Sequence, residues 1–132
     1  MKVLIADPDW HFSQRVSKFL ESRAHLVVYE PGLAAALEQA ARWGPDLVIL
    51  AAELAAGEGV MEALCSARPR PAILLTESMA RFDRAWRAWQ LGGDELLLKP
   101  VLSGYDLHQA IVTARENAAA GTPRRAVTAA SA

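Results

Sequence analysis

Five short runs of apolar residues recur along the chain, and a stretch with the spacing of an amphipathic helix follows each of them. Runs that are apolar at consecutive positions are typical of parallel strands covered on both faces. Strict alternation of such strands with helices, joined by right-handed crossovers, predicts an α/β fold with one parallel sheet between two layers of helices. The expected strands are residues 3–6, 26–29, 47–50, 72–75 and 96–98.

The expected helices carry recognisable start and stop signals. Asp9 can cap the first helix, whose apolar face includes Phe12 and Val16. Ser103 can cap the last helix, and Asp106 stands three residues later, as in a capping box. Between them we expect helices over residues 33–43, 60–67 and 79–91, which makes five helices in all.

Length and composition favour one domain that binds neither nucleic acid nor an acidic membrane. The 132 residues are 52% hydrophobic, enough for a packed core, and the formal net charge of −1 gives no field that attracts nucleic acid or an acidic membrane. The single cysteine, Cys65, cannot form an internal disulfide. No apolar run reaches membrane-spanning length and the start is too short for a signal peptide, so we expect a cytoplasmic protein. We expect a domain over residues 1–118 and a flexible tail over 119–132.

Three strand ends carry residues that resemble the receiver domains of two-component response regulators. The segment GGDELLLKPV, residues 92–101, resembles the stretch in which that family carries its lysine, here Lys99. Thr76 ends the fourth run, where the family has Ser or Thr, and Asp7 ends the first, where the family has two acids. The resemblance covers roughly residues 1–118 and implies a flavodoxin-like (CheY-like) three-layer sandwich with strand order 2-1-3-4-5.

The third run ends in alanine where the family has its phosphate-accepting aspartate. In the segment PDLVILAAEL, residues 45–54, Ala51 follows the strand, and Gly59 stands eight residues later, as in the family. A methyl group supplies neither a nucleophile nor a metal ligand. The resemblance therefore implies a pseudo-receiver, a receiver that lacks its acceptor.

Two further positions depart from the family pattern. Pro8 replaces the second acid of the first strand, and Leu96 replaces the aromatic switch residue three before Lys99. Because Mg²⁺ prefers carboxylate ligands, we expect no metal, no cofactor and no catalysis. In the remnant pocket of Asp7, Pro8, Thr76 and Lys99, we expect Lys99 to pair with Asp7 and Thr76 to bond locally. The alternative is that Lys99 and Thr76 still bind an anion.

A stripe of apolar residues on the expected fourth helix ends in Trp89. We expect Phe82 and Trp86, four residues apart, to face the sheet and Trp89 to stay partly exposed. The resemblance implies that the fourth helix, fifth strand and fifth helix form the partner-binding surface, with Ala85, Trp89 and Leu98 as candidate contacts. The expected partner is a histidine kinase, a downstream signalling protein or a second copy of the chain.

The interpretation that follows is a stand-alone pseudo-receiver of a phosphorelay system that acts by phosphorylation-independent protein–protein interaction and is not an enzyme. Two alternatives remain open. A flavodoxin-like sheet can carry a small-ligand or enzymatic site at its carboxyl edge. A receiver can also be phosphorylated at an atypical acceptor, for which Glu53 and Asp9 are the candidates.

Overall fold

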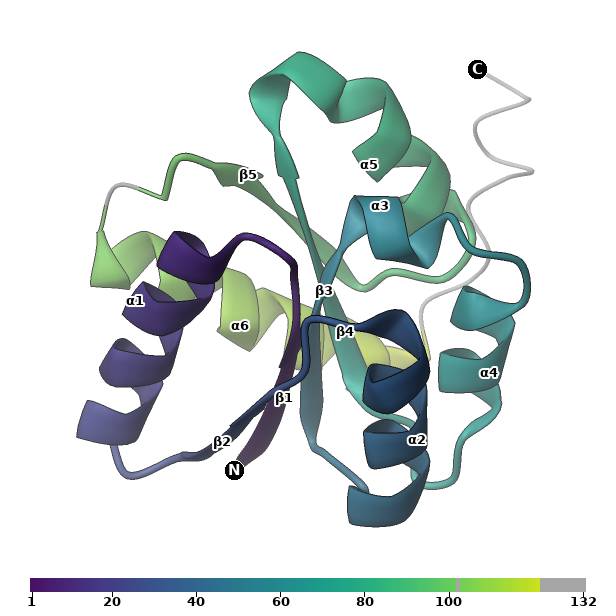
Figure 1. Cartoon of the computed structure of the whole chain (residues 1–132), viewed down its shortest axis with the longest axis horizontal. Coiled ribbons are helices and arrows are strands. Elements are labelled where there is room, and N and C mark those ends of the chain that lie inside the picture. The colour runs from purple at the N-terminus through teal and green to yellow at the C-terminus, as the bar shows by residue number, and fades with distance from the viewer. Residues whose placement is uncertain (102, 122–132) are drawn as a thin grey trace.

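The computed structural model of the 132-residue chain describes residues 1–101 and 103–121. Its centre is a five-stranded parallel sheet in the order β2-β1-β3-β4-β5, with helices on both faces (Figure 1). The expected flavodoxin-like three-layer fold is therefore confirmed. The strands are β1 (Lys2–Ala6), β2 (Leu26–Tyr29), β3 (Leu47–Ala51), β4 (Ala72–Ser78) and β5 (Glu95–Lys99).

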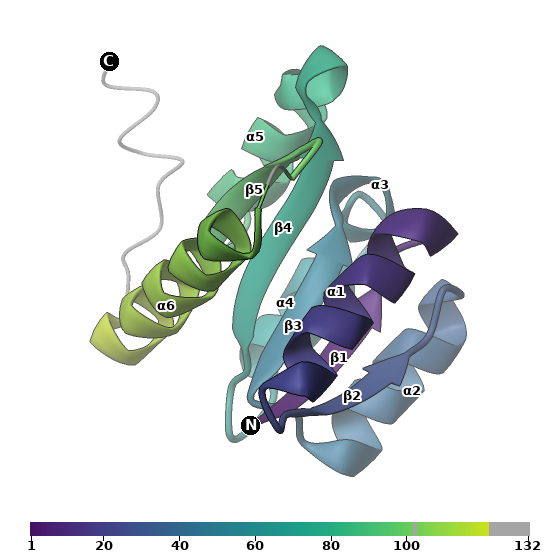
Figure 2. The same cartoon turned by 90° about the vertical axis from the view of Figure 1, so that its left-hand side faces the viewer.

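Two apolar layers, one on each face of the sheet, form the core. Helices α1 and α6 cover one face and α2, α3, α4 and α5 cover the other (Figure 2). Successive side chains of a strand point to opposite faces, so in β1 Val3 and Ile5 pack under α1 and α6 whereas Leu4 packs in the other layer. All three are at most 1% exposed. The α-helices are α1 (Trp10–Ser22), α2 (Leu33–Trp43), α3 (Ala52–Ala55), α4 (Val60–Ser66), α5 (Phe82–Gln90) and α6 (Gly104–Ala120).

The described residues form six α-helices, one more than expected, because the segment after β3 turns at once into the short helix α3. Gly59 then has a φ of +74°, a left-handed conformation that side-chain-bearing residues rarely adopt, and this turn separates α3 from α4. The expected helix over residues 79–91 begins with a 3₁₀ turn, η1 (Met79–Arg81), before α5. Neither difference changes the strand order.

Both expected helix caps are present. The Asp9 carboxylate accepts a hydrogen bond from the backbone N–H of Phe12 at 3.1 Å, and the Ser103 hydroxyl accepts one from that of Asp106 at 3.2 Å. Helix α6 continues to Ala120, two residues past the expected domain boundary at 118. The rest of the expected tail, residues 122–132, lies outside the described part of the chain.

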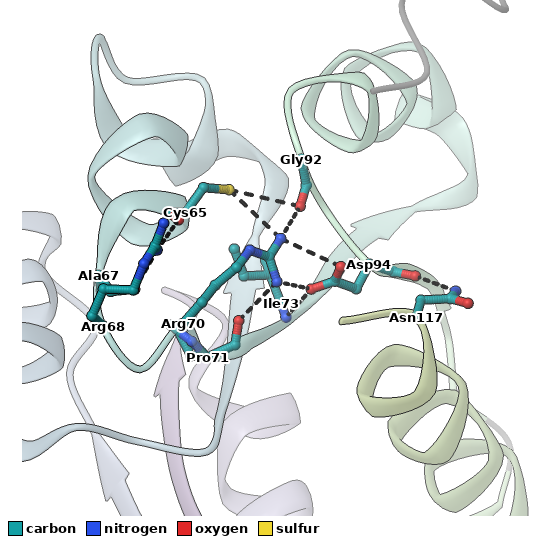
Figure 3. A network of polar contacts seen from close by, with 9 residues as sticks. All are labelled: Cys65, Ala67, Arg68, Arg70, Pro71, Ile73, Gly92, Asp94 and Asn117. Carbon is teal, nitrogen blue, oxygen red and sulfur yellow. Dashed lines mark hydrogen bonds and ion pairs between the residues drawn. The ribbon is translucent and has the colours of Figure 1, made fainter. Parts of the chain in front are cut away.

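A polar network at the amino end of the sheet ties β4 to β5 (Figure 3). The buried carboxylate of Asp94, 2% exposed, lies 2.8 Å from Nη1 of Arg70 and accepts a 2.8 Å hydrogen bond from the backbone N–H of Ile73. Arg70 also donates through Nη2 to the carbonyl of Gly92 at 2.8 Å. One guanidinium thus neutralises the buried acid and fixes the turn before β5.

Candidate functional site

The candidate site lies at the carboxyl edge of the sheet, where the strand ends bring Asp7, Ala51 and Thr76 side by side. Ala6 is paired with Leu50, so Asp7 follows at the level of Ala51, and Ala51 is itself paired with Thr76. Lys99 ends β5, the next strand. The sheet therefore brings together three of the four expected pocket residues and places Ala51 between them.

The carboxylate of Asp7 is the centre of this site. Its Oδ2 accepts a hydrogen bond from the Thr76 hydroxyl at 2.7 Å and lies 2.8 Å from Nζ of Lys99. Its Oδ1 accepts a hydrogen bond from the backbone N–H of Asp9 at 2.9 Å. Asp7 and Thr76 are each 1% exposed. A buried carboxylate with three donors is well compensated for its loss of hydration.

The bond between Asp7 and Thr76 crosses the end of an intervening strand. Asp7 follows β1 and Thr76 belongs to β4, and β3 lies between these two strands. Two strand spacings are about 9.6 Å, so both side chains must lean over the end of β3 to meet. The residue there is Ala51, 3% exposed, and its methyl group leaves room for the bond. The volume beside Ala51 is therefore filled by the protein's own polar groups.

Lys99 contacts two carboxylates and an aromatic ring. The expected ion pair with Asp7 is confirmed, and Nζ also lies 3.2 Å from Oδ2 of Asp9 and 4.4 Å from the ring centroid of Phe12. The hydrogen bond from the backbone N–H of Phe12, together with Lys99, holds the pKa of Asp9 below its ordinary value. The ammonium is thus neutralised from within the chain.

The remaining predicted site residues lie around this centre. The expectation that Thr76 bonds locally is wrong, since its partner is 69 residues away in the chain. Pro8 is exposed between Asp7 and the α1 cap, and Glu53 is exposed in the first turn of α3. Leu96 is half-buried and packs in the layer that contains α5.

Ser13, which the sequence did not single out as a site residue, contacts the backbone of Asp7 from helix α1. Ser13 is fully buried, and its hydroxyl donates to the backbone carbonyl of Asp7 at 3.3 Å. A signal was present, because Ser13, Val16 and Leu20 share one face of α1 by their spacing. A serine on a face that is otherwise apolar indicates a buried polar partner.

The chemistry available at this edge follows from these contacts. Ala51 offers no atom that can attack a phosphoryl group, and the two carboxylates of the site, Asp7 and Asp9, both contact the Lys99 ammonium. Within the described residues, no group of three or more His, Cys, Asp or Glu side chains is arranged to hold a metal ion. The arrangement is an ion-pair cluster of one ammonium and two carboxylates that joins β1, β4, β5 and α1.

Helix α5 presents its aromatic residues differently from the expectation. Phe82 and Trp86 were expected to face the sheet, but they are 44% and 37% exposed. Ala85, 1% exposed, faces the core with Ala88 instead, so Ala85 contributes no contact surface. The small side chains of Ala85 and Ala88 let α5 pack closely on the sheet, and the larger rings lie on the side of the helix. Trp89, like Leu98, is half-buried against the core.

The two exposed rings and the half-buried ring of Trp89 form a continuous strip, here called the aromatic ridge and defined by Phe82, Trp86 and Trp89. The centroids of Phe82 and Trp86 are 6.3 Å apart in a stacked arrangement, and those of Trp86 and Trp89 are 5.0 Å apart. Arg84, on the same helix, forms an ion pair with Glu77 at the end of β4. The ridge is therefore an aromatic surface on one side of α5.

In the part of the chain that the structure covers, no helix is long and apolar enough to cross a membrane. No protein-family model and no curated protein sequence matches the chain. Solved structures do match it, and those most similar include receiver domains.

A response regulator receiver domain protein from Clostridium thermocellum matches with a TM-score of 0.72 at 24% identity, over 87% of this chain and 94% of its own. The receiver domain of NtrX from Brucella abortus matches with a TM-score of 0.73 at 18% identity, over 86% and 98%. A third match, with a TM-score of 0.74 at 18% identity over 87% of this chain, is described as a family of streptococcal redox sensors that evolved from two-component response regulators.

Some of the matched proteins are longer than this chain. It spans 51% of the streptococcal structure and 27% or 28% of three longer NtrX chains. At these identities the matches show the fold, which is that of response-regulator receiver domains.

Proposed function

We propose that the chain is a receiver-like protein of two-component signalling that acts by protein–protein contact, without phosphorylation at residue 51. The receiver fold supports the signalling class, because the matched structures are receiver domains. The absence of a carboxylate at Ala51 and the substitution of Pro8 support independence from aspartyl phosphorylation. The setting proposed for this activity is the cytoplasm, and no catalytic role is assigned.

The observation that carries this proposal is the hydrogen bond between Asp7 and Thr76 beside the methyl group of Ala51. An acceptor carboxylate would have to occupy the space in which these two side chains meet. A metal ion would have to displace the Lys99 ammonium from Asp7 and Asp9. Both steps of receiver phosphorylation, metal binding and in-line attack, are therefore opposed by bonds that already exist.

The aromatic ridge supports the second half of the proposal. Phe82 and Trp86 are large rings with much of their surface in solvent, and exposed aromatic clusters are typical of protein contact sites. Trp89 of the ridge and Leu98 of β5 pack against the same core layer, and both are half-buried. The proposed partner is a histidine kinase, a downstream signalling protein or a second copy of this chain.

Intact-mass spectrometry after incubation with acetyl phosphate and Mg²⁺ tests the phosphorylation half. The expected result is an unchanged mass, while a receiver that keeps its acceptor aspartate, treated in parallel, gains one phosphoryl group. A stoichiometric gain by this chain that hydroxylamine removes would contradict the proposal. Loss of that gain in Glu53→Gln or in Asp9→Asn would then identify the atypical acceptor.

A further inference from the structure

A cavity of about 280 Å³ opens between α1 and α6 near the amino end of the sheet. It lies at the opposite end of the strands from the Asp7 and Lys99 cluster, and none of the cluster residues lines it. Its volume lies just below the range of about 300–1,000 Å³ that is usual for small-molecule sites, so it suits a small ligand. A ligand bound in this cavity would contact none of the residues on which the proposed function rests.

The floor of this cavity is apolar and belongs to the core. Leu20 of α1 and Ile111 of α6 are 1% and 5% exposed, and both line it. Phe19, half-buried, forms part of the wall. A ligand in this cavity would rest on buried side chains, so an apolar body would gain from leaving water there.

The rim of the cavity is cationic. Arg23 and His25, just after α1, face Arg115 and His108 of α6 across the opening, and Glu116 is the single acid among the lining residues. Among the described residues, neither Arg23 nor Arg115 forms an ion pair with a carboxylate. The guanidinium of Arg23 stacks over the Phe19 ring, with its Cζ 4.7 Å from the ring centroid, and a stacked arginine can still donate its in-plane N–H groups to an anion.

The contacts of His25 indicate how positive this opening is. Its Nδ1 lies 3.0 Å from the amino group of Met1. Burial lowers the pKa of His25, and the positive charges of Met1, Arg115 and Arg23 lower it further, with His108 adding to the effect. The positive groups around His25 thus disfavour its protonation. A bound anion would reduce the repulsion between them.

We propose that this cavity binds a small amphipathic carboxylate, with its apolar body against Leu20 and Ile111 and its charge between Arg23 and Arg115. The apolar floor favours a ligand with an apolar body. The two guanidinium groups favour a carboxylate, which arginine can bind in a bidentate manner. The cavity volume fits a small molecule better than a folded partner.

Isothermal titration calorimetry with octanoate as the probe tests this assignment on the full chain. We expect saturable binding at one site, with at least tenfold weaker binding of 1-octanol, which has the body without the charge, and of acetate, which has the charge without the body. The double variant Arg23→Gln, Arg115→Gln should bind octanoate at least tenfold more weakly. The matched control is Arg42→Gln, an exposed arginine of α2 that pairs with Glu38, and it should bind as the native chain does.

A second measurement keeps the test valid if the double variant does not fold. In the native chain, octanoate should raise the pKa of the His25 imidazole, followed by NMR, because a carboxylate nearby favours the charged ring. Equal affinity for octanoate and 1-octanol, no saturation, or an equal loss in Arg42→Gln would overturn the proposal. So would a His25 titration that octanoate leaves unchanged.

Discussion

The hydroxyl of Thr76 donates a 2.7 Å hydrogen bond to the carboxylate of Asp7, although β3 lies between β4, which contains Thr76, and β1, which Asp7 directly follows. This contact depends on the small side chain at the end of β3, because any larger group at Ala51 would stand between the two partners. Under the proposed function, the alanine that stands at the acceptor position is thus also the residue that leaves room for this bond.

Replacing Ala51 by aspartate should test this relationship directly. In Ala51→Asp a second carboxylate is buried beside Asp7, and like charges at short range destabilise each other. We expect the free energy of unfolding to fall by about 2 kcal/mol, the order of cost of an incompletely paired buried charge. Urea unfolding with millimolar MgCl₂ should recover part of this loss, since two adjacent carboxylates can bind the ion. The control Ala51→Asn, of similar size without charge, should show no recovery; an equal recovery there would contradict the explanation.

Removing the ammonium of Lys99 should leave the buried carboxylate of Asp7 undercompensated. We expect Lys99→Met to lower the free energy of unfolding by about 2 kcal/mol, whereas Lys18→Met, on the exposed side of α1, should change it by less than about 0.5 kcal/mol. In a double-mutant cycle, adding Asp7→Asn to Lys99→Met should cost less than the sum of the single changes. Strict additivity in urea unfolding would show that the two charges do not stabilise each other.

The stability of the protein should decrease in acid because of Asp9 and Glu77. Burial raises the pKa of Glu77, but the bonds from Arg84 and from the backbone N–H of Ser78 outweigh it, so its pKa lies below the ordinary 4.5. The pKa of Asp9 also lies below its ordinary 3.8. Since both folded-state values are depressed, their contribution is present above the ordinary values and is lost as the pH falls through the folded-state values.

Thermal unfolding between pH 2 and about pH 6 measures this acid dependence. Asp9→Asn and Glu77→Gln should each be less sensitive to acid than the native chain, and Glu58→Gln, at an exposed position, serves as the control. A native-like acid slope in both variants would show that other carboxyl groups control the loss.

The Arg70 and Asp94 pair offers a comparison of two neighbouring arginines. Arg70→Met leaves Asp94, 2% exposed, without its charged partner, so we expect a loss of about 2–3 kcal/mol in unfolding free energy. Arg68 is exposed and bonds to backbone carbonyls of its own segment (Figure 3), so Arg68→Met should change stability by less than about 0.5 kcal/mol. Similar losses of stability in both variants would contradict this, because they would show that the loss comes from changing the segment around residues 68–70 and not from breaking the ion pair.

The aromatic ridge predicts opposite outcomes for its two tryptophans. Trp86→Ala removes a ring that is 37% exposed, so it should leave the melting temperature nearly unchanged and weaken partner binding or self-association at least tenfold, about 1.4 kcal/mol. Trp89→Ala opens a space against the core and should cost about 3 kcal/mol of stability. Differential scanning calorimetry checks the stability of both variants. Sedimentation, or recovery of bound partners, checks their association. Unchanged association in Trp86→Ala would place the contact surface elsewhere.

The apolar pattern predicted the parallel sheet, and the resemblance to receiver domains predicted its strand order and one contact of the site. Strand ends carry their residues to a common edge, so the pairing of Lys99 with Asp7 could be predicted from the family frame. The hydrogen bond from Thr76 to Asp7 could not be predicted in this way. It forms across the end of β3, and no local sequence pattern shows that two side chains can meet over an intervening strand. The orientation of α5 was missed for a different reason. Its aromatic stripe resembles a core face, but the smaller Ala85 packs closer to the sheet and leaves Phe82 outside.

The neutralised state of Lys99 has a consequence for how information could pass through this protein. A receiver with an acceptor stores a signal for as long as its covalent mark survives, so the lifetime of the mark sets the duration of the response. Here the ammonium already has its two counter-ions within the chain. Under the proposed function, the duration of the response therefore does not depend on how long a covalent mark at residue 51 survives.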